Sequence, residues 1–73
     1  MANWLPTKIV GSLQAVQAFI MLLQHYRVAA SDGFSIAVDF DEDIPSNILY
    51  IERQDGTSGT LTLEEAEIWC QSI

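Results

Sequence analysis

The densest group of ionisable side chains in the sequence is the acidic run Asp39-Phe40-Asp41-Glu42-Asp43. In an extended chain, alternate residues project to one side about 6.5 Å apart, because each residue rises about 3.3 Å. Carboxylates so arranged could act as a general acid and base, or they could bind a cation. Acid–base chemistry also needs a cleft around the carboxylates, and nothing in a chain of 73 residues points to one. We therefore predict no catalytic residues.

A calcium-binding loop is the second chemistry to consider for this run. Its acids at positions 39, 41 and 43 match the first three ligand positions of such a loop. However, Ile44 stands where the loop needs a glycine, and Tyr50 stands where it needs its last glutamate. These two departures disfavour a metal site.

Two interpretations of the acidic residues stay open. They could form a recognition surface that mimics nucleic-acid phosphates or binds Lys and Arg of a partner. They could also form a solvated loop whose charges block edge-to-edge pairing of strands. Residues 32–73 carry all ten acids, and the net charge of the chain is −7. The acids predicted to bind a partner are Asp39, Asp41, Glu42, Asp43, Glu52, Asp55 and Glu67.

The remaining reactive residue types are few. One cysteine, Cys70, allows no intrachain disulfide, and with one histidine, His25, it cannot supply a zinc site of standard ligand number. The sequence has no phosphate-binding loop, dinucleotide-binding glycine turn or nucleophile elbow. We therefore predict a chain that is not an enzyme and that holds no cofactor.

An uncharged helical stripe is the second candidate contact surface. No Lys, Arg, Asp or Glu occurs between residues 9 and 26, although a solvent-facing helix usually carries such residues. Interface cores are depleted of charge and enriched in Met, whereas scattered exposed apolar residues are ordinary. The stripe opposite the predicted core face comprises Gln14, Gln17, Met21, Gln24 and Val28.

The stripe belongs to a helix that is predicted to begin after Ser12, which can cap it, and to end at Ser31-Asp32-Gly33. The preceding residues 1–11 are predicted to form a turn or a short helical lead-in, with Pro6 at a first helical position. The predicted core face of the helix comprises Leu13, Val16, Phe19, Ile20, Leu23 and Tyr26.

Strand patterns follow this helix. Residues 34–40 alternate strictly, which predicts a strand with one buried face. A loop over residues 41–47 leads to a second strand over residues 47–54, and the hairpin turn Asp55-Gly56 leads to a third near residues 60–62. The side chains predicted to point inward from the first of these strands are those of Phe34, Ile36, Val38 and Phe40, while those of Ser35, Ala37 and Asp39 point outward.

The last helix begins with a capping box, Thr62-Leu63-Glu64-Glu65. The resulting order, α-β-β-β-α, predicts a single α+β domain over residues 1–73: an antiparallel three-stranded meander with both helices packed on one face. The apolar stripe of the last helix comprises Leu63, Ala66, Trp69, Cys70 and Ile73.

The setting is predicted from the same residues. Residues 1–30 loosely resemble a secretory signal, but Gln14 and Gln17 interrupt the apolar run and His25 and Arg27 crowd the supposed cleavage site. We reject that interpretation, and the run is also too short and too broken for a membrane span. A cytoplasmic location is expected.

The charge and the two surfaces together predict a binding protein. Net negative charge repels nucleic acid and anionic membranes and favours a basic protein partner. The composition is similar to that of many phage- or plasmid-encoded inhibitors, among them anti-CRISPR proteins, immunity proteins and antitoxins, although no aligned residues carry the likeness. The leading hypothesis is a stoichiometric inhibitor or adaptor that binds a basic, nucleic-acid-handling protein through its acidic half. The alternative is a structural subunit that forms a homodimer or docks through the uncharged helix face.

Overall fold

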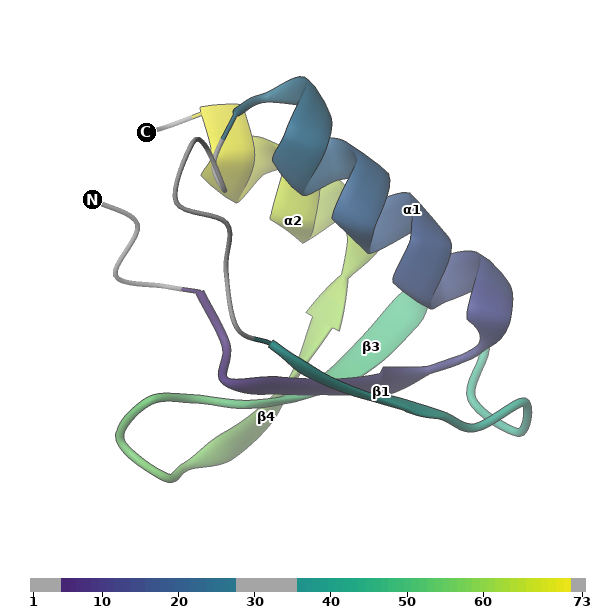
Figure 1. Cartoon of the computed structure of the whole chain (residues 1–73). Helices are drawn as coiled ribbons and strands as arrows, with labels where there is room; N and C mark the ends of the chain where they lie inside the picture. Colours follow the sequence, from purple (N-terminus) through teal and green to yellow (C-terminus); the bar gives the residue numbers. More distant parts are fainter. Residues whose placement is uncertain (1–4, 28–35, 72–73) are drawn as a thin grey trace.

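The fold is a single sheet with both helices on one of its faces (Figure 1). The computed structural model describes residues 5–27 and 36–71. The strands lie in the order β2-β1-β3-β4, in which β1 runs parallel to β2 and antiparallel to β3, and β3 runs antiparallel to β4. The chain therefore belongs to the α+β class. The elements are β1 (Lys8–Gly11), α1 (Leu13–His25), β2 (Ala37–Phe40), β3 (Ile48–Glu52), β4 (Ser58–Thr62) and α2 (Leu63–Gln71).

The first strand corrects the predicted topology. Residues 8–11 were expected in a turn or helical lead-in, and Pro6 in a first helical position, but Lys8–Gly11 forms β1, an inner strand paired on both sides. The sheet is therefore mixed and four-stranded, and β1-α1-β2 is a parallel crossover unit rather than part of a meander. The residue types of β1, Lys-Ile-Val-Gly, do not alternate between polar and apolar, although their burial does. The pairing of β1 comes instead from neighbours that lie far away in the sequence.

The first helix begins where it was predicted and ends earlier. The Ser12 Oγ accepts a hydrogen bond from the Ala15 N–H at 3.1 Å, which confirms Ser12 as the N-cap. The helix ends at His25, and Arg27 adopts a left-handed φ of 57° shortly after it. The predicted stop at residues 31–33 lies outside the described residues.

The core face of α1 is turned toward α2 relative to the prediction. Val16, Phe19 and Leu23 are buried as predicted, but Leu13 is 50% exposed and Ala15 is fully buried in its place. The sequence pattern shows which residues of α1 are apolar, but it does not show that α2 packs beside this helix. The position of α2 decides which side of α1 is buried. Ile20 and Tyr26, the other predicted members, are half-buried.

The predicted inward face of β2 is only partly correct. Ile36 and Val38 are half-buried, whereas Phe40 is 59% exposed and Phe34 lies outside the described residues. Because β2 is the last strand on its side of the sheet, its end receives less cover from the helices than the inner strands receive. Its predicted outward residues Ala37 and Asp39 are exposed.

The centre of the molecule is a close contact between sheet and helix. Ile9, Phe19, Leu49 and Leu61 are fully buried. A Cβ added at Gly11, at the end of β1, would lie 2.5 Å from the Leu49 Cδ2. Glycine at this position therefore allows the core to close, because any side chain would displace a buried leucine.

Local signals in the second half of the chain are confirmed. In the β3–β4 hairpin, Gly56 has a φ of 88°, and the Arg53 N–H donates to the Thr57 carbonyl oxygen at 2.8 Å. In the capping box, the Glu65 N–H donates to the Thr62 Oγ at 3.1 Å, and the Thr62 N–H donates to the Glu65 Oε1 at 3.2 Å. In the apolar stripe of α2, Ala66 and Cys70 are buried and Leu63 and Trp69 are half-buried, and Ile73 lies outside the described residues.

Candidate functional site

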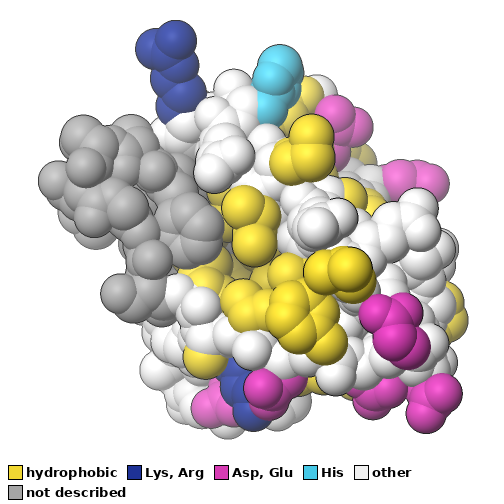
Figure 2. Space-filling view, turned by 45° about the vertical axis from the view of Figure 1, so that its right-hand side comes forward, with side chains coloured by type: hydrophobic (Ala, Val, Ile, Leu, Met, Phe, Trp, Pro, Cys, Tyr) yellow, Lys and Arg dark blue, Asp and Glu magenta, His cyan; other side chains and the backbone are white. Residues whose placement is uncertain are grey.

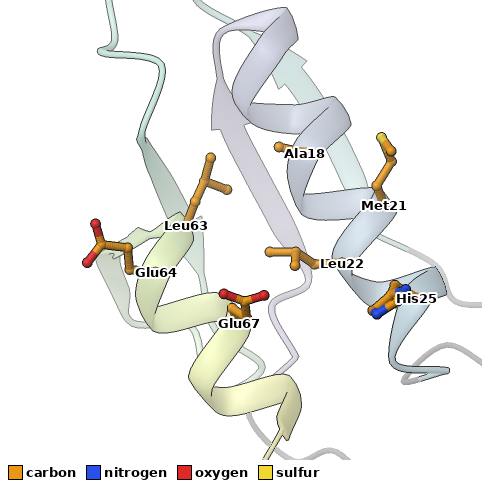
Figure 3. Close-up of a pocket in the computed structure, with 7 residues that line it drawn as sticks. All are labelled: Ala18, Met21, Leu22, His25, Leu63, Glu64 and Glu67. Carbon is orange, nitrogen blue, oxygen red and sulfur yellow. The ribbon is translucent and has the colours of Figure 1, made fainter.

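An open groove lies between α1 and α2 and has a volume of about 490 Å³. Its wall is mostly apolar, with acidic side chains on the α2 side (Figure 3). The residues that line it are Ala18, Met21, Leu22 and His25 of α1 and Leu63, Glu64 and Glu67 of α2.

The groove results from a small residue where the two helices face each other. Ala18 and Leu22 lie on the side of α1 toward α2, and Leu22 points across toward it (Figure 3). Ala18 carries only a methyl group, so it does not fill the space beside Leu63, the first residue of α2. The helix pair is thus left with an unfilled apolar hollow at its surface.

Beside the groove, a polar clamp at Tyr26 links the two helices. The Tyr26 hydroxyl donates to the Glu67 Oε2 at 3.2 Å and accepts from the Gln71 Nε2 at 3.1 Å. The His25 ring stands edge-on to Tyr26, with ring centroids 4.8 Å apart. These contacts hold the end of α1 against α2 and so define the spacing of the groove walls.

The charge around the groove is negative. Glu64 and Glu67 are its acidic lining residues, and its lining contains neither Lys nor Arg. Glu64 lies in the first turn of α2, where the positive end of the helix dipole favours a carboxylate. An occupant of this groove would therefore meet an apolar wall with a negative edge.

The uncharged stripe of α1 adjoins the groove. Gln14, Gln17 and Gln24 are exposed, and Met21 is 66% exposed; Val28 lies outside the described residues. Met21 belongs to the stripe and also lines the groove, so the two form one continuous surface. Figure 2 shows hydrophobic side chains gathered in the middle of one face, with acidic side chains toward its borders.

Sequence reasoning found the stripe but missed the groove. Ala18, Leu22 and His25 follow one another at four- and three-residue steps beside the stripe, which is the signal that could have marked a second helical edge. Leu63 was assigned to the capping box and to the apolar stripe of the last helix, and Glu64 to the capping box alone, since no sequence pattern reports which side of one helix faces another.

The predicted acids do not form one surface. The loop of residues 41–47 lies where both helices begin, because the Leu13 N–H donates to the Glu42 Oε1 and the Leu63 N–H donates to the Asn47 carbonyl oxygen, each at 3.0 Å. Asp41, Glu42 and Asp43 therefore lie at this end. Glu52 and Asp55 lie at the opposite end of β3, in or beside the hairpin.

Several of these carboxylates already have partners within the chain. Asp39 forms an ion pair with the Lys8 Nζ at 3.1 Å, with both side chains well exposed. The Asp41 Oδ1 accepts from the Asp43 N–H at 3.0 Å, which is a local turn contact. Within residues 5–27 and 36–71, the Asp43 and Glu52 side chains accept no hydrogen bond from the protein.

Asp55 is held by Thr57 in the hairpin. Its Oδ1 accepts from the Thr57 hydroxyl at 2.7 Å and from the Thr57 N–H at 2.9 Å. These hydrogen bonds, that of the hydroxyl first, lower the pKa of Asp55 below its ordinary value because they favour the charged form. The role that this carboxylate visibly fills is to stabilise the turn.

The open face of the sheet carries a shallower hollow of about 280 Å³, lined in part by Lys8, Val10, Tyr50 and Glu52. Tyr50 is 50% exposed. Lys8, its one cation, is opposite Glu52 and already paired with Asp39. This hollow is smaller and more polar than the groove between the helices, and we do not assign it a ligand.

The groups with potential for chemistry are dispersed in the described parts of the chain. No three His, Cys, Asp or Glu side chains among them lie close enough together to hold a metal ion. Burial raises the pKa of the Cys70 thiol, and the nearby charge of Glu67 adds to the rise, so this thiol stays protonated at neutral pH. Neither of the two helices has the length and apolar character to cross a bilayer, as far as residues 5–27 and 36–71 extend.

No protein-family model, curated protein or solved structure matches the chain. The argument for function therefore rests on its own residues. These define a small α+β protein with an apolar groove between its helices, an uncharged helix face beside it and acids at both ends of the sheet.

Proposed function

We propose that the chain is a non-enzymatic protein-binding module, an inhibitor or adaptor, that contacts a basic partner protein through the uncharged face of α1 and the adjoining groove. The observation that carries the proposal is Met21. It is 66% exposed at the centre of a helix without Lys, Arg, Asp or Glu, and it lines the apolar groove. Charge depletion and exposed Met are the composition of an interface core.

The charge of the molecule supports a basic partner. At −7, the chain attracts cationic surfaces over distances on the order of a Debye length of 10 Å and accelerates their approach. Proteins that handle nucleic acid present such surfaces, since they neutralise phosphates with Lys and Arg. In this proposal the acids at both ends of the sheet steer the partner, and the α1 face and groove make the close contact.

The test is affinity capture from the cells that produce the chain, followed by mass spectrometry. Wild-type protein is expected to retain a partner, and Met21→Glu to lose it, because a carboxylate would then be buried in the contact. The control Thr60→Glu adds the same charge at an exposed position of β4 and should retain the partner. Circular dichroism should show that all three proteins are folded.

Two outcomes would overturn this assignment. Capture that is unaffected by Met21→Glu would place the contact elsewhere. Loss of capture by Asp41→Lys with Asp43→Lys, with Met21→Glu fully active, would assign the close contact to the acidic loop, as the recognition-surface hypothesis has it.

A second candidate function is self-association through the same face. It is favoured by the exposure of Leu13 and Met21 of α1, which are 50% and 66% exposed. Light scattering decides between the two. A dimer that Met21→Glu converts to a monomer would support a structural subunit, and a wild-type monomer at high concentration would exclude it.

A further inference from the structure

We infer that the groove between α1 and α2 binds a cationic amphipathic helix of the partner, which inserts two apolar side chains and places a Lys or Arg beside Glu64. This inference rests on the proposed function and names the partner's chemistry. It follows from the length of the groove, its charge and the kind of groups that line it.

The length of the groove suits two helical side chains. Its α1 wall runs from Ala18 to His25, which is about 10 Å at about 1.5 Å per residue. Side chains four residues apart on a helix lie about 6 Å from each other on one face. Two of them fit within the groove's length and its volume of about 490 Å³, whereas a longer apolar seam would extend past His25, the last α1 residue of the lining.

The lining favours a helix over a strand. An added strand needs a row of free backbone donors and acceptors. The groove walls are instead the sides of two helices, in which backbone groups beyond the first turn are bonded within the helix. The N–H of Leu63, the first residue of α2, donates to the Asn47 carbonyl oxygen. Ala18, Leu22 and Leu63 offer apolar contact only. An occupant of this groove therefore binds through its side chains, as a helix in a groove does.

The charge selects a cationic helix. The Glu64 side chain is exposed and, among the described residues, accepts no hydrogen bond from the protein. The Glu67 Oε2 accepts from Tyr26, and within residues 5–27 and 36–71 its Oε1 accepts no hydrogen bond. A Lys or Arg one turn from an apolar anchor would complement this edge. A second copy of the chain would instead bring like charges together, since each copy carries −7.

The probe is a synthetic helical peptide of about 15 residues with two Leu residues four positions apart and flanking Lys residues. Its binding to the full chain is followed by amide chemical shifts. Shifts are expected at Ala18, Leu22 and Leu63. Replacing both Leu residues with Ser should weaken binding by roughly tenfold or more, and replacing the Lys residues with Glu should abolish it.

Matched variants of the chain separate the groove from general attraction to an acidic protein. Glu64→Gln and Asp43→Asn each remove one charge, and only Glu64 lines the groove. Glu64→Gln is expected to weaken peptide binding by about two- to fivefold, and Asp43→Asn to leave it nearly unchanged. Equal effects of the two variants would overturn the inference, as would shifts confined to the open face of the sheet.

The failure of the inference can be told apart from failure of the proposed function. If Met21→Glu prevents capture of the partner but the Lys–Leu peptide does not bind, the proposed protein-binding function stands. The inference that the groove binds a cationic helix is then wrong. If the Lys and Glu peptides bind equally well, the occupant is a neutral apolar group, and the charge argument is wrong. If Met21→Glu changes only the oligomeric state, the occupant is a second copy of this chain.

Discussion

Glu42 shows that a carboxylate in an acidic cluster can have a structural task. Its side chain accepts a hydrogen bond from the Leu13 N–H, the first of the unpaired donors of α1. It therefore joins the loop of residues 41–47 to the start of the helix that carries the uncharged stripe. A charge count would assign Glu42 and Asp43 the same role, whereas their contacts differ.

We predict that Glu42→Ala lowers the free energy of unfolding by about 1 kcal/mol, because the helix loses a capping acceptor and a favourable charge near its positive end. Urea unfolding followed by circular dichroism measures this change. The matched control, Asp43→Ala, removes the same charge from a side chain that accepts no hydrogen bond in the described structure. An equal loss in both variants would contradict a capping role for Glu42.

At the scale of elements, the side chain of Tyr26 joins α1 to α2 by hydrogen bonds. The Tyr26 hydroxyl stands between Glu67 and Gln71 and links the end of α1 to the second half of α2. The groove lies beside this clamp, so its width depends on contacts between two helices that are separated in the chain by the sheet strands β2, β3 and β4.

We predict that Tyr26→Phe destabilises the protein by about 0.5–1.5 kcal/mol, since the two hydrogen bonds of its hydroxyl, to Glu67 and from Gln71, are lost. It should also shift the amide resonances of Leu63 and Glu67 at the groove. Thermal unfolding and two-dimensional NMR measure the two effects.

The control for this prediction is Tyr50→Phe on the open sheet face. The Tyr50 hydroxyl makes no hydrogen bond within the part of the chain that the structure describes, so its removal should change stability little. If Tyr50→Phe proved as destabilising as Tyr26→Phe, the clamp would have no special role.

At the scale of the whole molecule, the charges are unbalanced. The chain has ten Asp and Glu residues but three Lys and Arg residues. Within residues 5–27 and 36–71 there is one ion pair, between Lys8 and Asp39. Acids near the starts of both helices are favoured by the helix dipoles, but the sum of the charges opposes compaction.

We predict that the folded state becomes more stable as salt rises from about 20 to 200 mM, by on the order of 0.5 kcal/mol, because screening weakens the repulsion among the acids. Urea unfolding at each concentration of NaCl measures this change, and KCl should give the same result. A decrease in stability with salt would show that attractive pairs dominate instead.

Much of the fold could be predicted because its signals are local. Ser12 caps the first helix, the Thr62–Glu65 box begins the second, and Asp55-Gly56 forms the turn between β3 and β4. Each signal acts within about four residues, so a single sequence contains all that is needed. The exposed Gln and Met stripe of α1 followed from the same helical period.

The first strand and the groove could not be predicted in the same way. Lys8–Gly11 becomes a strand because β2 and β3 pair with it, and its four residues carry no period of their own. The groove forms where Ala18 of α1 leaves space beside Leu63 of α2, two residues that only the packing of both helices on one sheet face brings together.

The sequence by itself determined the acidity, the uncharged helix and the local starts and turns, because composition and short-range hydrogen bonds do not depend on distant residues. Tertiary structure alone decided which acids stay available and where the apolar groove lies. It joined Glu42 to Leu13 and Asp39 to Lys8, and it placed Met21 at the edge of a groove with Glu64 and Glu67. The physical reason is that these contacts join residues whose separation in the chain gives no pattern, and they form only when the sheet and both helices pack together.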